Sequence, residues 1–294
     1  MTDTIGFIGL GIMGQPMALN LLRAGHALAV HARREQSMAP LAEAGAETCP
    51  SPAEVARRAS VVFTMVADTP DVEQVILGPQ GVIEGVGPDS LIVDMSTIAP
   101  SATRAIAARL REAGADMLDA PVSGGDIGAR DGTLSIMVGG EAAAFERARP
   151  LLESMGSNIV HIGGNGAGQV CKACNQTVVA QTIAGIGEAL LLAEASGVDG
   201  ARVREALLGG FAGSRILEVH GRRMLDGDYT PGFKAALHQK DMRIVLEAAD
   251  ELGVALPGAA QVAQYLNALV GQDQGELDSA AIYRIQRRLN GREG

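Results

Sequence analysis

The sequence contains no tryptophan, and aromatic residues make up only 3% of its 294 residues. Proteins that bind single-stranded nucleic acid stack bases on aromatic side chains, so this scarcity argues against such a function. Basic residues are also few, with 24 Lys and Arg against 34 Asp and Glu and a formal net charge of −10. Because there is no basic excess to displace counterions, we expect no binding to nucleic acid.

Cysteines and uninterrupted apolar runs are scarce as well. Three cysteines cannot build a disulfide framework, which favours a reducing, cytoplasmic location. The first residues lack a basic segment followed by a cleavable apolar one, so we expect no signal peptide. Polar residues and glycines interrupt the most apolar stretch, residues 178–193, and a membrane span needs roughly 20 largely apolar residues. We interpret this stretch as a buried central helix and expect no membrane association.

The two halves of the chain differ in pattern, and 47% hydrophobic content over 294 residues is enough for two domains. The first half alternates short apolar runs with amphipathic segments, which predicts a mostly parallel sheet with helices on both faces. After the glycine-rich residues 163–168 every segment is helical in pattern. The sequence therefore predicts an α/β Rossmann-like domain at residues 1–163. An all-α domain at residues 164–294 follows it, and a long central helix joins the two.

The expected strands and helices have the following bounds. In the first half, strands are expected at 4–8, 27–31, 61–66, 91–94, 117–120, 134–138 and 158–162. Helices are expected there at 15–24, 39–44, 71–77, 100–113 and 141–155, with a further helix start at Ser51-Pro52-Ala53-Glu54. In the second half, helices are expected at 169–196, 201–208, 214–225, 235–252, 258–270 and 279–289.

A glycine motif follows the first strand, in the run Gly9-Leu10-Gly11-Ile12-Met13-Gly14. In a strand–turn–helix context, Gly9 permits the turn, Gly11 lets a pyrophosphate approach the backbone and Gly14 lets the helix pack on the strand. The amide groups and the dipole of the helix N-terminus then favour phosphate. The motif predicts a dinucleotide site, and the alternative is an ordinary turn between a strand and a helix.

Three further loops follow strands at the sheet edge where ligands of such folds bind. They contain Met65-Val66, Ser96-Thr97 and the segment from Asp119 to Gly125. The last combines a proline, Ser123 and two glycines, which predicts a tight loop whose amides and hydroxyl can hold a carboxylate. A plain turn is the alternative interpretation.

A lysine near the start of the long helix is the second signal. Lys172 and Asn175 are three residues apart and share a helix face. Burial and the helix dipole would lower the pKa of a lysine there, which suits a proton donor and acceptor. A lysine that extends to the surface is the commoner alternative. Cys171 and Cys174 have no second Cys or His pair nearby, so we interpret them as small helix-packing residues.

A third cluster of charged and titratable residues lies at His238, Lys240 and Asp241, within one turn of an expected helix. Taken alone, it could equally be a solvated face. The five histidines are scattered and no H-E-x-x-H pattern is present, so no metal site is expected.

Together these motifs resemble the β-hydroxyacid dehydrogenases, the family related to 3-hydroxyisobutyrate dehydrogenase. The resemblance extends over residues 4–290 and rests on four motifs in the same order. Residues 209–214 and 237–241 are most similar to the branch that reduces tartronate semialdehyde (2-hydroxy-3-oxopropionate). Residues 131–135 and 96–100 favour the same branch.

The resemblance implies a role for each motif. Lys172 would protonate the alkoxide that forms as NAD(P)H delivers hydride, and Asn175 would orient the substrate. The carboxylate of a small substrate would bind at Ser123, Gly124 and Gly125. Cofactor contacts are implied for Met65, Val66, Thr97 and Lys240. Relatives assemble through their helical domains, which implies a homodimer or homotetramer.

The residues after the second strand bear on cofactor choice. An NAD-selective site places Asp or Glu about 20 residues after the glycines, where it binds the ribose hydroxyls. The matching residues here include Arg33 and Arg34 and no carboxylate. Two guanidinium groups can grip a 2′-phosphate, so the sequence favours NADP(H) over NAD(H).

Several alternatives remain open at this stage. A 3-hydroxyisobutyrate dehydrogenase, an L-threonate dehydrogenase or a glyoxylate/succinic semialdehyde reductase would share the same machinery. Imine reductases share the fold but usually replace the catalytic lysine, so Lys172 argues against them. A non-catalytic nucleotide-binding assembly module is an alternative of a different class, and such relatives lose the lysine.

Overall fold

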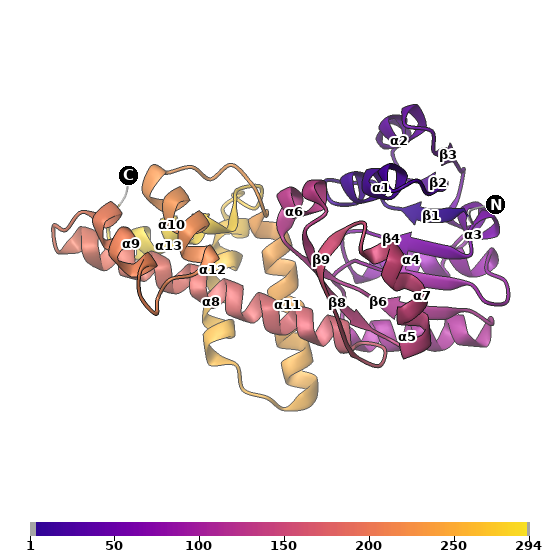
Figure 1. Cartoon of the computed structure of the whole chain (residues 1–294). Helices are drawn as coiled ribbons and strands as arrows, with labels where there is room; N and C mark the ends of the chain where they lie inside the picture. The colour runs from indigo at the N-terminus through magenta and orange to yellow at the C-terminus, as the bar shows by residue number, and fades with distance from the viewer. Residues whose placement is uncertain (1–3, 293–294) are drawn as a thin grey trace. The chain divides into compact units, whose positions relative to one another are not determined.

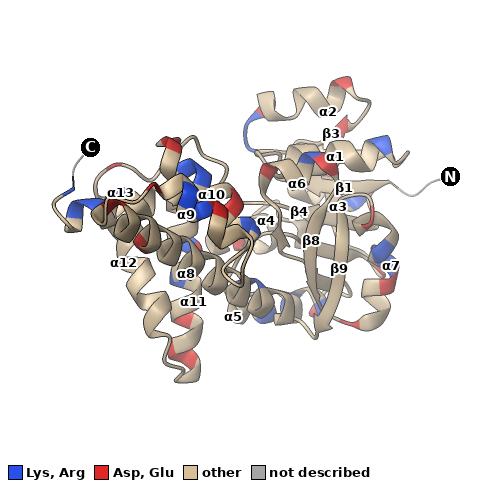
Figure 2. Ribbon diagram, turned by 60° about the vertical axis from the view of Figure 1, so that its left-hand side comes forward, with Lys and Arg blue, Asp and Glu red and all other residues tan. Residues whose placement is uncertain are grey.

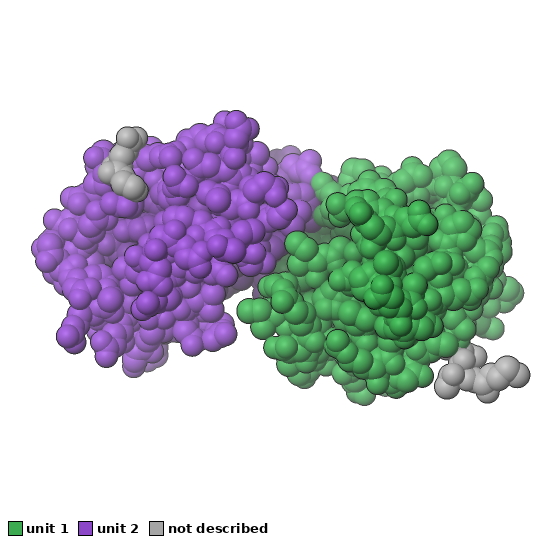
Figure 3. All heavy atoms as spheres, turned by 90° about the horizontal axis from the view of Figure 1, so that it is seen from above, with its two compact units in different colours: residues 1–172 green, residues 173–294 purple. Residues whose placement is uncertain are grey.

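The structure, a computed structural model, describes residues 4–292. Two compact units, residues 1–172 and 173–294, divide within one long helix (Figure 3). Each unit has hydrophobic core residues of its own. The sequence-based boundary between residues 163 and 164 lies shortly before this division and remains a prediction.

A sheet of short, largely buried strands organises the first unit. Its strands are β1 (Ile5–Ile8), β2 (Leu28–His31), β3 (Glu47–Thr48), β4 (Val61–Thr64), β5 (Leu91–Asp94), β6 (Asp116–Asp119), β7 (Val122–Ser123), β8 (Leu134–Gly139) and β9 (Gly156–Gly163). They lie in the order β3-β2-β1-β4-β5-β6-β8-β7, and β9 pairs with β8. Strands β1 to β6 are parallel to one another. Strand β8 is antiparallel to β6 and β7 and parallel to β9.

Helices cover both faces of this sheet (Figure 1). They are α1 (Gly14–Arg23), α2 (Ala39–Glu43), α3 (Pro52–Arg58), α4 (Thr69–Leu77), α5 (Pro100–Glu112), α6 (Gly125–Asp131) and α7 (Ala142–Leu152), with short 3₁₀ turns at Glu35–Ser37 and Val82–Glu84. Successive strand residues enter different core clusters, Phe7 and Phe63 one cluster and Ile8 and Val62 the other. This alternation explains why the central strands are apolar throughout, since both faces are buried.

The predicted alternation of strands and helices is confirmed, including the Ser51 cap, whose Oγ accepts a hydrogen bond from the Glu54 amide. Strands β3 and β7 and helix α6 were not predicted. The tight loop expected up to Gly125 is wrong in part, because Val122 and Ser123 form β7 and Gly125 begins α6. A two-residue strand depends on pairing with a distant segment, here β8, and leaves no local periodicity to detect.

The second unit is helical, as predicted. The long helix α8 (Ala167–Ala195) enters it from the first unit, and the other helices are α9 (Gly200–Leu208), α10 (Arg215–Asp226), α11 (Ala235–Leu252), α12 (Pro257–Gly271) and α13 (Ile282–Leu289), with a 3₁₀ turn at Ser279–Ala281. The buried Asp278 organises the segment before α11 by accepting hydrogen bonds from the amides of Gly232 and Phe233 and by pairing with Arg223. This holds the start of α11, which carries His238, Lys240 and Asp241.

Helix α8 is long and apolar enough to cross a membrane by length and composition, a test that core helices of soluble proteins also pass. Its most apolar window is 44% buried. Ile183 and Leu190 face the core of the second unit, whereas Val178 and Leu192 are exposed. The interpretation as a buried central helix is therefore correct for one side of α8 and wrong for the other.

Acidic and basic residues are interspersed along the helices (Figure 2). Arg215 pairs with Glu218 and Arg222 with Asp226 along α10, and Arg58 pairs with Glu54 on α3.

Candidate active site

The three glycines of the motif after β1 have distinct surroundings. Gly9 has φ +94°, and a Cβ there would overlap the carbonyl oxygen of Met65. A Cβ on Gly14 would overlap the carbonyl oxygen of Gly9, so helix α1 can approach the turn only with glycine at this position. Gly11 is exposed and has no atom within 4 Å of its Cβ position. Close packing within the protein therefore requires glycine at positions 9 and 14, whereas the space around Gly11 is open.

This open space is suited to a pyrophosphate. Met13, the residue before α1, makes no side-chain capping bond to the helix. Ile12 is 68% exposed, so the turn between Leu10 and α1 faces solvent. Uncapped amide groups at a helix N-terminus, next to an exposed glycine, form the anion-binding arrangement of dinucleotide sites. The residues present therefore fit the phosphates of a nicotinamide cofactor.

Two of the predicted cofactor loops are linked to each other. The amide of Val66, after β4, donates a 3.0 Å hydrogen bond to Oγ of Ser96, after β5. Met65 also reaches the glycine turn, since its carbonyl oxygen lies beside Gly9. The structure therefore brings Met65, Val66 and Thr97 to one edge of the sheet, together with the glycine motif.

Asp94, the last residue of β5, is a buried carboxylate beside the loop that contains Ser96. It was not predicted as a site residue. Its Oδ1 accepts hydrogen bonds from Oγ1 of Thr64 at 2.7 Å and from the amide of Ser96 at 3.3 Å. Its Oδ2 accepts none from the residues that the structure describes. Burial raises the pKa of Asp94 to about 6, against the opposing effect of the bonds from Ser96 and Thr64.

Arg33 and Arg34 are exposed just after β2, where the sequence places the ribose end of the cofactor. Arg33 forms an ion pair with Asp71 of α4, with 3.4 Å between Nη1 and Oδ1. The Arg33 side chain is 86% exposed, so this pair contributes little to stability and can yield to a stronger anion. Glu35 lies in the 3₁₀ turn that follows.

Lys172 is buried, with 7% of its surface exposed, and its Nζ atom donates a 2.8 Å hydrogen bond to the carbonyl oxygen of Val122. The alternative of a lysine that extends to the surface is therefore wrong. Val122 and Ser123 form β7, and the following Gly124 and Gly125 both have positive φ, at 137° and 65°. The ammonium group is thus held beside the segment predicted to bind a carboxylate.

The N-terminus of α8 is fastened to the sheet by Asp119, at the end of β6. Its carboxylate accepts hydrogen bonds from the amides of Gly166 at 2.8 Å and Gln169 at 3.0 Å. Burial raises the pKa of Asp119, while these amide bonds lower it. Gly168 packs so closely that its Cβ position lies 2.7 Å from the carbonyl oxygen of Asp119. This junction sets the place of Lys172, one turn further along the helix.

In the second unit, Asn175 is linked to Lys240 through Gln176, which the sequence did not single out, and through Asp241 of the predicted cluster. Asn175 donates to Oε1 of Gln176 at 2.7 Å, and Nε2 of Gln176 donates to Oδ2 of Asp241 at 2.6 Å. Nζ of Lys240 lies 2.8 Å from Oδ1 of the same carboxylate. The solvated-face alternative is wrong for this cluster, because Gln176, His238 and Asp241 are buried.

The cysteines of the helix do not share one environment. Cys171 is partly buried and Cys174 is exposed, so the helix-packing interpretation is wrong for Cys174. Among residues 4–292, no three His, Cys, Asp or Glu side chains are grouped closely enough to hold a metal ion.

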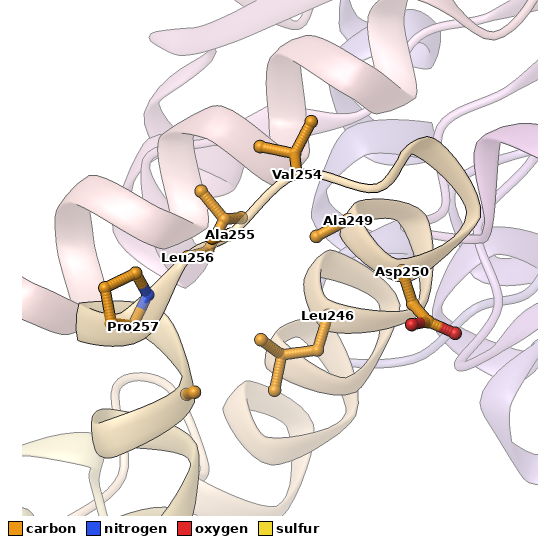
Figure 4. A pocket seen from close by; sticks show the side chains of 8 residues that line it. Leu246, Ala249, Asp250, Val254, Ala255, Leu256 and Pro257 are labelled. Carbon is orange, nitrogen blue, oxygen red and sulfur yellow. The ribbon is translucent and has the colours of Figure 1, made fainter.

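A separate hollow of about 350 Å³ lies between the end of α11 and the start of α12 (Figure 4). Its lining is mostly apolar and includes Leu246, Val254, Leu256 and Pro257, with Asp250 as its charged residue. None of the predicted site residues lines it, and it presents no pair of groups suited to acid–base chemistry.

Comparison with known proteins agrees with this arrangement. Residues 4–163 match the model of the NAD-binding domain of 6-phosphogluconate dehydrogenase. Residues 166–286 match that of the NAD-binding domain of NADP-dependent 3-hydroxyisobutyrate dehydrogenase. The chain is 49% identical to 2-hydroxy-3-oxopropionate reductase of Escherichia coli over 95% of each protein. It is 39% identical to NAD-dependent L-serine dehydrogenase of Pseudomonas aeruginosa, over 96% of this chain and 97% of that one.

Among solved structures, 3-hydroxyisobutyrate dehydrogenase of Mycobacterium tuberculosis with L-serine superimposes with a TM-score of 0.90. It is 33% identical, and the match covers 98% of this chain and all of that one. The resemblance inferred from the motifs is thereby confirmed, and so is the fold. The chain belongs to the β-hydroxyacid dehydrogenases, the family of NAD(P)-dependent oxidoreductases related to 3-hydroxyisobutyrate dehydrogenase.

Proposed function

We propose that this oxidoreductase reduces tartronate semialdehyde (2-hydroxy-3-oxopropionate) to D-glycerate with NADPH. The observation that carries the proposal is the buried Lys172, whose Nζ donates to the carbonyl of Val122 beside Ser123. A cation is thus available next to a segment suited to a carboxylate. The 49% identity to a reductase of this substrate supports the choice among small aldehyde acids.

The substrate carboxylate binds at Ser123, Gly124 and Gly125 in this proposal. Both glycines have positive φ, a conformation that exposes successive amide groups on one side of the chain. Ser123 adds a hydroxyl donor. Asn175, one turn after Lys172 on α8, orients the substrate by its amide.

Lys172 acts as the general acid. The bound cofactor supplies the hydride that the aldehyde carbon accepts. The Lys172 ammonium group donates its proton to the carbonyl oxygen as negative charge develops there, and the neutral amine is left. In the reverse direction the neutral amine takes the proton of the alcohol. Acid–base help of this kind is worth on the order of 10²–10⁴ in rate.

NADP(H) is the proposed cofactor, in preference to NAD(H). Arg33 and Arg34 are exposed after β2, and Arg33 pairs with the surface carboxylate of Asp71. A 2′-phosphate offers more charge and more acceptors than that carboxylate. Met65, Val66, Thr97 and Lys240 complete the proposed cofactor contacts.

A steady-state screen tests the substrate and the cofactor together. Tartronate semialdehyde, glyoxylate, succinic semialdehyde and methylmalonate semialdehyde are reduced with NADPH and with NADH, and the matching hydroxy acids and L-threonate are oxidised. We expect the highest kcat/KM with tartronate semialdehyde and NADPH. A higher value with another substrate would assign the enzyme to that branch, and no turnover with any would favour a non-catalytic module.

We also propose that the protein is cytoplasmic and forms a homodimer or homotetramer. Its three cysteines are free, as in proteins of reducing compartments. Val178 and Leu192 leave apolar surface exposed on α8, at 62% and 69%. Such surface on a single chain is typical of a subunit interface. Light scattering after size-exclusion chromatography measures the assembly, and a monomeric mass at micromolar concentration would exclude it.

A further inference from the structure

Gln169 lies in the first turn of α8 and is 1% exposed. Its side-chain Nε2 donates a 2.8 Å hydrogen bond to the carbonyl oxygen of Ser96, and its Oε1 accepts one of 3.2 Å from the amide of Ile98. These two backbone groups stand on either side of Thr97. The side-chain amide of Gln169 therefore binds the backbone on both sides of Thr97, the residue proposed to contact the cofactor.

The backbone of Gln169 is hydrogen-bonded to the sheet as well. Its amide donates to Oδ2 of Asp119 at the end of β6. Ser96, which Gln169 holds by its carbonyl oxygen, also accepts the Val66 amide and donates its own amide to Asp94. A continuous set of hydrogen bonds thus runs from the loops after β4 and β5 to the N-terminus of α8.

Lys172 lies three residues after Gln169 on the same helix, so the two side chains project from neighbouring positions of one face. Hydride and proton must reach the two atoms of one carbonyl group, which requires the acid and the nicotinamide to be held in a defined relation. A misplacement of about 1 Å can cost about 10²-fold in rate. The Gln169 amide directly links the helix that carries the acid to the loop that carries Thr97.

We propose that Gln169 is a positioning residue. It fixes the position of Lys172 relative to the loop that carries Thr97, as coupled proton and hydride transfer requires. The proposal rests on the proposed roles of Lys172 and Thr97. It makes Gln169 a determinant of turnover, although its side chain is bonded to backbone groups of the protein and is not assigned a contact with the substrate.

The test compares wild type with Gln169→Met, which keeps the length of the side chain and removes both polar atoms of its amide. We expect kcat to fall by about 10- to 100-fold, while the KM of the aldehyde acid changes by less than about threefold. The deuterium isotope effect with 4-deuterated NADPH is expected to rise, because the chemical step becomes slower relative to product release. The dissociation constant of NADPH, measured by its fluorescence, is expected to rise about tenfold.

Gln286→Met is the matched control. Gln286 is also buried, on α13 of the second unit, and its Nε2 donates to the carbonyl oxygen of Ala184. The control is expected to lower the melting temperature and to leave kcat, the isotope effect and NADPH affinity near wild type. If Gln169→Met does not fold, Gln169→Asn is used, since its shorter amide remains polar but cannot reach both backbone groups.

The positioning role is overturned if the Gln169 variant lowers only the melting temperature, as the control does, and keeps wild-type kcat, isotope effect and NADPH affinity. Failure of the proposed function is distinguishable, because wild type itself would then turn over no aldehyde acid. In that case the NADPH affinity of the variant still decides whether Gln169 orders the Thr97 loop, and an unchanged affinity overturns the inference.

Discussion

The Nζ atom of Lys172 lies 2.8 Å from the carbonyl oxygen of Val122, the residue before Ser123. The bond holds a buried ammonium group next to the segment that precedes α6, although Lys172 and Val122 are 50 residues apart in sequence. The bond orients Nζ without neutralising its charge, because a carbonyl group is a neutral acceptor. The proposed proton donor and the proposed carboxylate-binding segment are thus held side by side in the protein itself.

Lys172→Ala is expected to lower kcat/KM for the aldehyde acid by about 10²–10⁴-fold and to leave the NADPH dissociation constant within about threefold of wild type. The reason is that the variant loses the proton donor while keeping the glycine turn. Lys172→Arg serves as the control, since it retains a positive charge that cannot be released at neutral pH. Near-wild-type turnover in the alanine variant would show that another group supplies the proton.

Gly11→Ala and Gly14→Ala are expected to have opposite consequences. The Cβ of Gly11→Ala enters open space, so the melting temperature should stay near wild type while the NADPH dissociation constant rises by about tenfold or more. The Cβ of Gly14→Ala overlaps the Gly9 carbonyl, which should cost about 1–3 kcal/mol or more of stability. Circular dichroism melts and NADPH fluorescence measure both. Unchanged NADPH affinity in Gly11→Ala would mean that the pyrophosphate lies elsewhere.

The double variant Arg33→Ala/Arg34→Ala is expected to lower the ratio of kcat/KM with NADPH to that with NADH by about 10- to 100-fold. A single charge-assisted bond to the 2′-phosphate contributes roughly 1.5–3 kcal/mol, which accounts for an effect of this size, and NADH lacks that group. Asp71→Asn is the control, because it removes the surface partner of Arg33 and should change the ratio only slightly, toward NADPH. A wild-type enzyme that prefers NADH would contradict the assignment.

Asp94 makes stability depend on pH in a defined direction. Burial raises its pKa from 3.8 to about 6, so the native state binds more protons than the unfolded state between these values. Stability is therefore expected to fall by about 3 kcal/mol as pH rises from about 4 to above about 6. Asp94→Asn keeps an acceptor for Thr64 and should lack this decline. Urea unfolding of both proteins at several pH values measures the difference, and parallel profiles would contradict the prediction.

Local pattern was sufficient for much of the architecture. The apolar runs of β1, β4 and β5 are buried on both faces, and that burial is what the runs predicted. The helices of the second half were likewise recognisable by periodicity and by turn residues. Strand β7 was not, because its two residues are defined by pairing of Val122 with Ile136 and of Ser123 with Ser135. Helix α6 was missed as well, since two glycines and few apolar residues give it little pattern.

The candidate site, like the fold, could be predicted from the sequence only in part. Gly9, Gly11 and Gly14 could be assigned separate roles from spacing alone, and the crowding around the first and third agrees with those roles. Gln169 and Asp94 could not be selected, because glutamine and aspartate at such positions carry no distinctive spacing. Their importance comes from burial and from hydrogen bonds to residues 30 to 73 positions away.

The order of strands and helices, the glycine turn and a lysine near the start of a long helix could all be recognised from the sequence alone. These depend on neighbours within a few residues, where backbone preference and side-chain periodicity act directly. Only the tertiary structure decided that Lys172 is buried against Val122 and that Gln169 holds the Thr97 loop. The reason is physical: burial and hydrogen bonding are properties of a position within the folded chain, and distant segments supply the partners.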